Sequence, residues 1–239
     1  MSIFSNLDTG NVQSTPKDSL GGTGGFDGPT GVYLAEVVQV YGVAFDSGTR
    51  AVNVTLRIED KELSTTLFIA NKMGQTFNEY DGKRTEKAGF TRLKELVQAV
   101  TGGGLDSADV GEGMIKAWNK EEKKFTLQRN DQVFRSLSAA TVYVALERQV
   151  KNKQVKVGDS YQDTNDEAVS YEIKKFANSK GLTSAEVADG TTEGTFLKEW
   201  QNKFGGKTKN TFKHNPNAVT NGEPPAVNTS SNSTQKFAF

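Results

Sequence analysis

The strongest constraint on the fold is the alternation of apolar and polar residues between positions 31 and 70. In RAVNVTLRIED every second residue is aliphatic, and VYLAEVVQVY and LSTTLFIA follow the same pattern less strictly. A period of two places successive side chains on opposite faces of an extended chain, so that one face of each segment can be buried. We therefore predict three antiparallel strands, the second and third joined by a short turn at 60–62.

A helix and a second β region follow. FTRLKELVQAVTGGG has apolar residues at helical spacing, and its glycines are expected to end the helix. TVYVALERQV, KQVKVGD and AVSYEIKKF alternate again, whereas residues 104–125 show no clear period and are predicted to form a loop. Strands, one helix and more strands form an order compatible with a mainly β fold. The architecture expected is a five-stranded Greek-key barrel of the OB type over residues 30–180.

The two ends of the chain differ from this region in composition. Residues 1–29 are rich in glycine and predict a flexible arm. Residues 181–205 predict a helical appendage: Thr183 and Glu186 have the spacing of a capping box, and a second helix carries an aromatic at every fourth position. Residues 206–239 have few aliphatic side chains and predict a disordered tail.

The composition excludes several kinds of site. The chain has no cysteine and a single histidine at position 214, so it has no disulfide, no cysteine nucleophile and no Ser-His or Cys-His pair within the predicted domain. No phosphate-binding loop motif occurs, and the acidic stretch GDSYQDTNDEA is interpreted as a hairpin rather than a metal site. We expect a non-enzymatic protein without a cofactor, while a nuclease using carboxylates alone stays open. The N-terminus lacks a signal-peptide pattern and no apolar run could span a bilayer, which favours a cytoplasmic location.

Charge is balanced overall but not locally. Basic and acidic residues number 29 each, yet residues 71–94 and 116–135 each carry a net charge of +3. Such a segment is commonly a solvated face. A surface that holds single-stranded nucleic acid, however, needs cations along the backbone and aromatic rings on which bases stack. The stretch NKMGQTFNEYDGKRTEKAGF, residues 71–90, supplies both kinds of side chain in one connection.

Several blocks of the sequence resemble, in order, the single-stranded DNA-binding proteins of tailed bacteriophages. They are DSLGG, GPTGVYLAEVVQVY, IANKMGQTFNEYDGKRTEKAGF, VYVALERQVKNKQV and GLTSAEVADGTTEGTFLKEWQNKFGGKTK, and together they cover roughly residues 18–210. The resemblance implies an OB fold with a helix between its strands and a role in phage DNA replication and recombination. It also implies that residues 71–90 touch DNA, with Lys72, Lys83 and Arg84 on phosphates and Phe77 and Tyr80 available for stacking.

The residues predicted to bind single-stranded DNA combine this block with basic and aromatic positions on the strands. They are Arg57, Phe68, Lys72, Phe77, Tyr80, Lys83, Arg84, Lys87, Tyr143, Arg148 and Lys153. Binding is expected to ignore base sequence, because stacking and phosphate contacts read no base edges. The alternative for the aromatic residues is packing against their own loop or under an insertion.

Other functions stay open from sequence alone. The same exposed loop would suit a virion structural or assembly protein, and a strand-annealing factor or a carboxylate-dependent nuclease would share part of the pattern. Replication or recombination proteins are candidate partners, and the oligomeric state is left open. Many replication-linked binding proteins end in an acidic tail with a terminal aromatic. Here Phe239 is present but the tail is basic. We therefore expect deletion of the residues after Gly206 to leave DNA affinity unchanged or slightly weaker.

Overall fold

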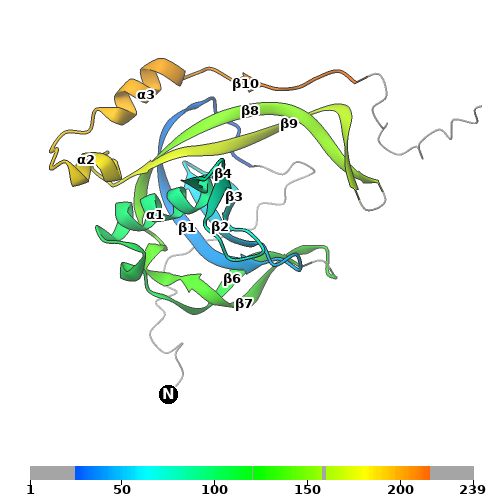
Figure 1. The fold of residues 1–239 in the computed structure, drawn as a ribbon, viewed down its shortest axis with the longest axis horizontal. Coiled ribbons are helices and arrows are strands. Elements are labelled where there is room, and N and C mark those ends of the chain that lie inside the picture. The colour runs from blue at the N-terminus through cyan, green and yellow to red at the C-terminus, as the bar shows by residue number, and fades with distance from the viewer. Residues whose placement is uncertain (1–24, 120, 158–159, 216–239) are drawn as a thin grey trace, which may run out of the picture.

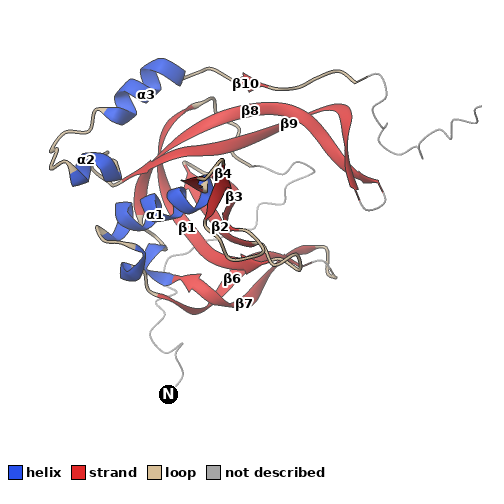
Figure 2. Cartoon of the chain, viewed as in Figure 1, coloured by secondary structure: helices blue, strands red, loops and turns tan. Residues whose placement is uncertain are grey.

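The protein is described by a computed structural model that places residues 25–119, 121–157 and 160–215. These residues form a mainly β fold built on one antiparallel sheet with few helices, as the sequence predicts (Figures 1 and 2). The predictions for residues 1–24 and 216–239, which include most of the arm and tail, lie outside the described residues. Within the described ranges no helix is long and apolar enough to cross a membrane.

The first three strands form where the alternation predicts them. They are β1 (Gly31–Ala44), β2 (Arg50–Ile58) and β3 (Lys61–Ala70), each antiparallel to the next. Their aliphatic faces are buried, with Val40 and its partner Val54 fully inaccessible. The turn between β2 and β3 is shorter than predicted, because Glu59 takes a positive φ of 53° and lets the chain reverse at once.

The second β region consists of two long strands rather than three short ones. β8 (Thr141–Val157) and β9 (Ser160–Ala177) form a hairpin that arches across the top of the molecule in Figure 1, and the first part of β8 pairs with β1. In the described part of the chain the sheet has eight strands, and β3 and β9 lie at edges that do not pair with each other. The edge of β3 carries one bridge, from Gly25 to Glu62. The predicted closed five-stranded barrel is therefore not observed: the sheet is larger and stays open between β3 and β9.

A further hairpin corrects the loop predicted at 104–125. β6 (Val110–Asn119) and β7 (Lys124–Phe134) pair along their length, and β7 joins the sheet where Val133 meets Tyr41 of β1. Short 3-10 turns, η1 (Leu105–Ser107) and η2 (Arg135–Leu137), lead into and out of the hairpin. The pattern was missed because apolar residues lie on both faces of β6, so that no period of two stands out.

The predicted helix α1 (Ala88–Thr101) lies in the opening between β3 and β9 and contacts both strands. Its buried Leu96 and Val97 belong to the main core, which includes side chains of β1, β2, β3, β8 and β9. Gly89 allows the helix to approach β3 closely, since a Cβ at this position would come within 2.4 Å of the Phe68 carbonyl oxygen. The side chains of α1 therefore pack between β3 and β9, two strands that form no backbone hydrogen bonds with each other.

The helical appendage is α2 (Ser184–Ala188) and α3 (Phe196–Phe204). The predicted capping box of Thr183 and Glu186 is confirmed. Partial burial acts to raise the pKa of Glu186, but hydrogen bonds from the backbone N–H groups of Phe196, Thr183 and Thr195 outweigh it and lower that pKa to about 2. Trp200 of α3 packs on Ala145 of β8, on the outer side of the sheet.

Residues near the two predicted boundaries are part of the folded unit. Phe26, assigned to the arm, packs edge-on against Tyr33 and Tyr171 with ring centroids 5.0 and 4.9 Å away. Residues 206–215, assigned to the tail, run beside β8, and β10 (Lys209–Asn210) pairs with that strand in parallel. The connection at 71–90 is also ordered: it forms a separate two-stranded hairpin of β4 (Phe77–Tyr80) and β5 (Lys83–Glu86).

Candidate nucleic-acid interface

A cleft of about 800 Å³ lies between the β6–β7 hairpin and the β8–β9 hairpin. In Figure 1 the β6–β7 hairpin lies below and the β8–β9 hairpin above, with β1–β3 between them. The lining side chains come from the strands of both hairpins, from β1–β3 and from the segment that precedes β1. They are Gly25, Phe26, Asp27, Gln39, Tyr41, Asn53, Thr55, Glu62, Leu63, Ser64, Thr65, Thr66, Lys116, Ala117, Trp118, Phe125, Arg148, Val169, Ser170 and Tyr171.

Two of the side chains that line this cleft are exposed aromatics. Trp118 and Phe125 face each other across the β6–β7 hairpin, with ring centroids 5.4 Å apart and an interplanar angle of 75°. Their exposed fractions are 51% and 62%. Aromatic surface of this size is normally buried or held against a partner, because leaving it in water is unfavourable. The pair therefore marks this end of the cleft as a surface for a flat or apolar ligand.

The two cations that line the cleft have no carboxylate partner among the described residues, whereas its two carboxylates have basic partners. Lys116 is exposed and has no carboxylate partner among the described residues, and Arg148 interacts with the Tyr171 hydroxyl and donates to Thr208 at 3.3 Å. Of the two lining carboxylates, Asp27 pairs with Lys61, and Glu62 shares Arg57 with Glu36. The hydrogen bond from Lys61 holds the pKa of Asp27 below its usual value. The charge left for an anionic ligand is positive.

One side chain attaches the β6–β7 hairpin to the central sheet. Gln39 of β1 donates from Nε2 to the Lys116 carbonyl at 2.9 Å, and the Lys116 N–H donates to Gln39 Oε1 at 2.9 Å. Beneath this link, Ile115 and Val133 pack on Tyr41. Lys116 and the neighbouring Trp118 are thus held relative to β1, so this side of the cleft has a fixed shape.

Of the residues predicted on the strands, Arg148 lines the cleft. Arg57 lies at its border, occupied by ion pairs with Glu36 at 2.9 Å and Glu62 at 3.4 Å. Tyr143 lies elsewhere, packed in the outer cluster of Ala145, Leu197 and Trp200. Lys153 is exposed on β8, beyond the residues that line the cleft.

The predicted residues of the block 71–90 gather on the β4–β5 hairpin and its flanks, outside the cleft. Arg84 is held by Glu79 at 2.9 Å and lies 4.7 Å from the centroid of the Phe77 ring. Lys87 donates to Asn78 Oδ1 at 2.6 Å. Lys72, Lys83 and Tyr80 are exposed, Tyr80 with 87% of its side chain accessible. Within this block Phe77, Arg84 and Lys87 contact side chains of the block itself, whereas Lys72, Tyr80 and Lys83 are exposed.

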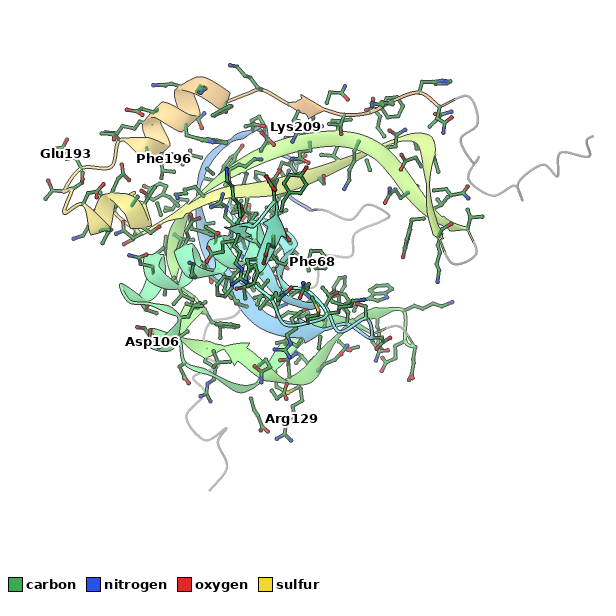
Figure 3. All side chains as sticks on the ribbon, in the orientation of Figure 1. Phe68, Asp106, Arg129, Glu193, Phe196 and Lys209 are labelled. Atoms are coloured by element: carbon green, nitrogen blue, oxygen red, sulfur yellow. The ribbon has the colours of Figure 1, made fainter. Side chains whose placement is uncertain are left out.

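Phe68 lines a second groove, between β3 and β9, rather than the cleft. Its ring is 54% exposed and stacks on Phe45 with centroids 5.8 Å apart and an interplanar angle of 27°. In Figure 3 Phe68 lies between the two hairpins, while Arg129 projects from the β6–β7 hairpin on the side away from the β8–β9 hairpin.

Sequence reasoning missed Lys116, Trp118 and Phe125 as site residues. Trp118 and Phe125 flank a short charged stretch that begins with Asn119, whose side chain accepts from the backbone N–H groups of Glu121 and Glu122. Two aromatics on either side of an Asn-led polar turn are a hairpin signal that could have placed them together.

In the described ranges no group of three or more metal-binding side chains is found. No protein-family model matches the chain, and a search of curated proteins finds no significant match.

Proposed function

We propose that this protein binds single-stranded DNA in the cleft, without a preference for base sequence. The observation that carries the proposal is the exposed Trp118–Phe125 pair beside Lys116, with Arg148 on the opposite wall of the same cleft. Rings of this kind accept any base by stacking, and the cations follow the phosphates. Neither contact reads a base edge, so affinity follows strand length and charge rather than sequence.

The arrangement of the strands supports an OB-type fold that is left open. β3, β2, β1, β8 and β9 follow one another in space, with α1 in the opening between the two ends. In OB folds the face of the second and third strands and the adjoining loops bind oligonucleotides. The cleft is lined by β1–β3 and by the two hairpins that follow α1, and the contribution of β2 and β3 supports the comparison. The resemblance to phage single-stranded DNA-binding proteins agrees with this function and implies a role in phage replication and recombination in the host cytoplasm.

The test is a titration of a fluorescein-labelled dT30 oligonucleotide followed by anisotropy at several salt concentrations. Binding should weaken linearly on a log–log plot against salt, because each neutralised phosphate releases counterions. A single-stranded 30-mer of mixed base sequence should bind with similar affinity. A blunt duplex of the same length should bind far more weakly. Absence of binding to any single strand at low salt would reject the proposal.

Protein contact is the second candidate, because Met114 and Leu127 on the same hairpin are also exposed, by 49% and 71%. Aliphatic side chains contribute little to stacking but suit a protein interface. This candidate corresponds to the virion assembly role and predicts association that is insensitive to salt. A carboxylate-dependent nuclease is tested separately. Labelled dT30 is incubated with the protein and Mg²⁺, and its length is followed on a gel: a nuclease shortens the oligonucleotide, whereas a binding protein leaves it intact.

A further inference from the structure

We infer that a bound single strand does not end in the cleft but continues through a second groove between β3 and β9, which we call the seam. This inference rests on the proposed function and adds a second binding segment to it. The seam has a volume of about 510 Å³. Its lining residues come from β3, β8, β9 and the start of α1, with one residue from β4. They are Thr65, Thr66, Leu67, Phe68, Asn78, Lys87, Ala88, Gly89, Arg92, Gln149, Lys151, Ser170, Tyr171, Glu172 and Ile173.

The seam and the cleft adjoin each other. Thr65 and Thr66 of β3 line both, and so do Ser170 and Tyr171 of β9. One extended chain can therefore lie against both hollows at these four residues. The shared walls are polar, which suits the sugar and phosphate of a nucleotide better than an apolar ligand.

The seam repeats the two kinds of side chain found in the cleft. Phe68 presents a 54% exposed ring backed by Phe45, which gives a base a flat surface that is already held in place. Among the described residues, the exposed Lys151 has no carboxylate partner, and Lys87 is bound only by the neutral Asn78 side chain. The lining carboxylate, Glu172, pairs with Lys174 at 2.8 Å, and Lys174 also pairs with Glu147 at 3.0 Å. A stacking ring beside available cations is the same combination that the cleft offers.

Open strand edges add hydrogen-bonding groups along this path. In the described part of the chain β3 pairs with β2 and β9 pairs with β8, so the edges that face each other across the seam carry backbone groups that do not pair with one another. An open edge presents backbone N–H and C=O groups that can form hydrogen bonds with another chain. Because β3 and β9 do not pair, single-stranded DNA can lie between them. In a closed barrel the hydrogen bonds between these two strands would exclude it.

The inference predicts that affinity depends on oligonucleotide length in two stages. Labelled dT6, dT12, dT18 and dT30 are titrated by anisotropy against the full-length wild type and against Phe68→Ala/Lys151→Ala. Short strands should bind both proteins equally, because they occupy the cleft alone. The longest strand should lose roughly 5-fold or more in affinity in the variant, the lower end of the range for one stacked base.

Matched controls lie on the same hairpin as Lys151. Lys156→Ala removes an exposed cation further along β8, and Tyr161→Ala removes an exposed ring of β9. Neither residue lines the seam or the cleft. The control variants should bind every length as the wild type does. Circular dichroism and a thermal melt of each variant report whether it is folded.

The outcomes separate this inference from the proposed function. If Phe68→Ala/Lys151→Ala binds all lengths like the wild type, or loses short and long strands equally, the two-segment path is overturned while DNA binding stands. If the wild type binds no single strand, both fall. Phe68→Trp gives an independent check that keeps the core intact: its added fluorescence should be quenched by dT30 and not by dT6, and quenching by neither would overturn the inference.

Discussion

The β4–β5 and β6–β7 hairpins carry the same kinds of residue but use them differently. On β4–β5, Arg84 is shared between Glu79 and the Phe77 ring, so the cation and the aromatic satisfy each other. On β6–β7, Trp118 and Phe125 contact each other edge-on and remain more than half exposed. Beside them, Lys116 has no carboxylate partner in the part of the chain that the structure describes.

The difference comes from what surrounds each hairpin. β4–β5 is a sheet of its own, tied to the start of α1 by Glu86, whereas β6–β7 is fixed to β1 and faces the β8–β9 hairpin across a cleft. A ring and a cation in one segment indicate a ligand site only if the fold places them opposite another wall. Composition alone cannot tell the two hairpins apart.

Removing the aromatic pair from the cleft is the most direct way to break this comparison. Trp118→Ala/Phe125→Ala should weaken dT30 binding by about 1 to 3 kcal/mol for each base that no longer stacks. Both side chains are exposed, so the thermal midpoint should change little. Anisotropy of labelled dT30 measures the first quantity and circular dichroism the second.

The matched variant on the other hairpin is Phe77→Ala/Tyr80→Ala, which should bind dT30 nearly as the wild type does. The opposite result, with loss of binding in this variant and none in the cleft variant, would return the site to the block at 71–90.

Detaching the β6–β7 hairpin from β1 sharpens the comparison without touching its rings. Gln39→Ala removes both hydrogen bonds to the Lys116 backbone, at a cost of about 0.5 to 1.5 kcal/mol for each bond. Hydrogen exchange at the Lys116 amide should become faster and dT30 affinity should fall. Gln128→Ala, which removes a hydrogen bond to Ala117 within the hairpin, is the control. Equal effects of the two variants on affinity would contradict a specific role for the link to β1.

Salt dependence compares the cations of the two hairpins. Lys116→Ala/Arg148→Ala should lower the slope of log affinity against log salt by roughly 0.7 for each phosphate that the protein no longer neutralises. Lys83→Ala/Arg84→Ala should leave the slope near the wild-type value, since neither residue lines the cleft and Arg84 already pairs with Glu79. A larger change in slope for the second pair would place the phosphates on β4–β5.

The smallest expected effect concerns how β4–β5 is tied to α1. Thr91 and Lys94 each donate to Glu86 at 2.6 Å. Partial burial acts to raise the pKa of Glu86, but these hydrogen bonds outweigh it and hold that pKa below 4.5. A lowered folded-state pKa gives stability that is present above pH 4.5 and is lost as the pH falls through the folded value.

Glu86→Gln should therefore loosen the hairpin by about 0.2 to 1 kcal/mol at pH 7, and the difference from the wild type should shrink on acidification below pH 4.5. Hydrogen exchange of the β4–β5 amides measures this, and dT30 binding at pH 7 should be unaffected. A variant effect that grows on acidification would show that the charge of Glu86 is not what holds the hairpin.

The sequence predicts the elements whose two faces differ. β1–β3, α1 and the capping box at Thr183 were all predictable, because burial of one face imposes a period or because a cap requires particular side chains at fixed spacing. β6–β7 was not, since Met114 and Trp118 on one face of β6 and Ile115 on the other are all apolar.

The candidate site was harder to predict than the elements. Arg148 of β8 was predicted and lines the cleft. The residues opposite it, Lys116, Trp118 and Phe125, belong to a different hairpin, β6–β7, and were not predicted. Which residues meet depends on the docking of two hairpins onto β1, and that depends on single contacts such as Gln39 to Lys116, which leave no periodic trace in the sequence.

The segment after α3 takes over the edge of β8 where β1 leaves it. The Gly206 N–H donates to the Thr30 carbonyl at 2.8 Å, β10 pairs with Gln149 and Val150, and the side chain of Asn152 makes two hydrogen bonds with the backbone of Lys213, at 2.8 and 2.9 Å. For recombinant expression, a fragment cut at residue 205 would keep every described helix yet bare this edge, and exposed edges recruit other chains. A fragment spanning residues 25–215 keeps this edge of β8 covered. Of the two truncated forms, it is the one that should stay monodisperse.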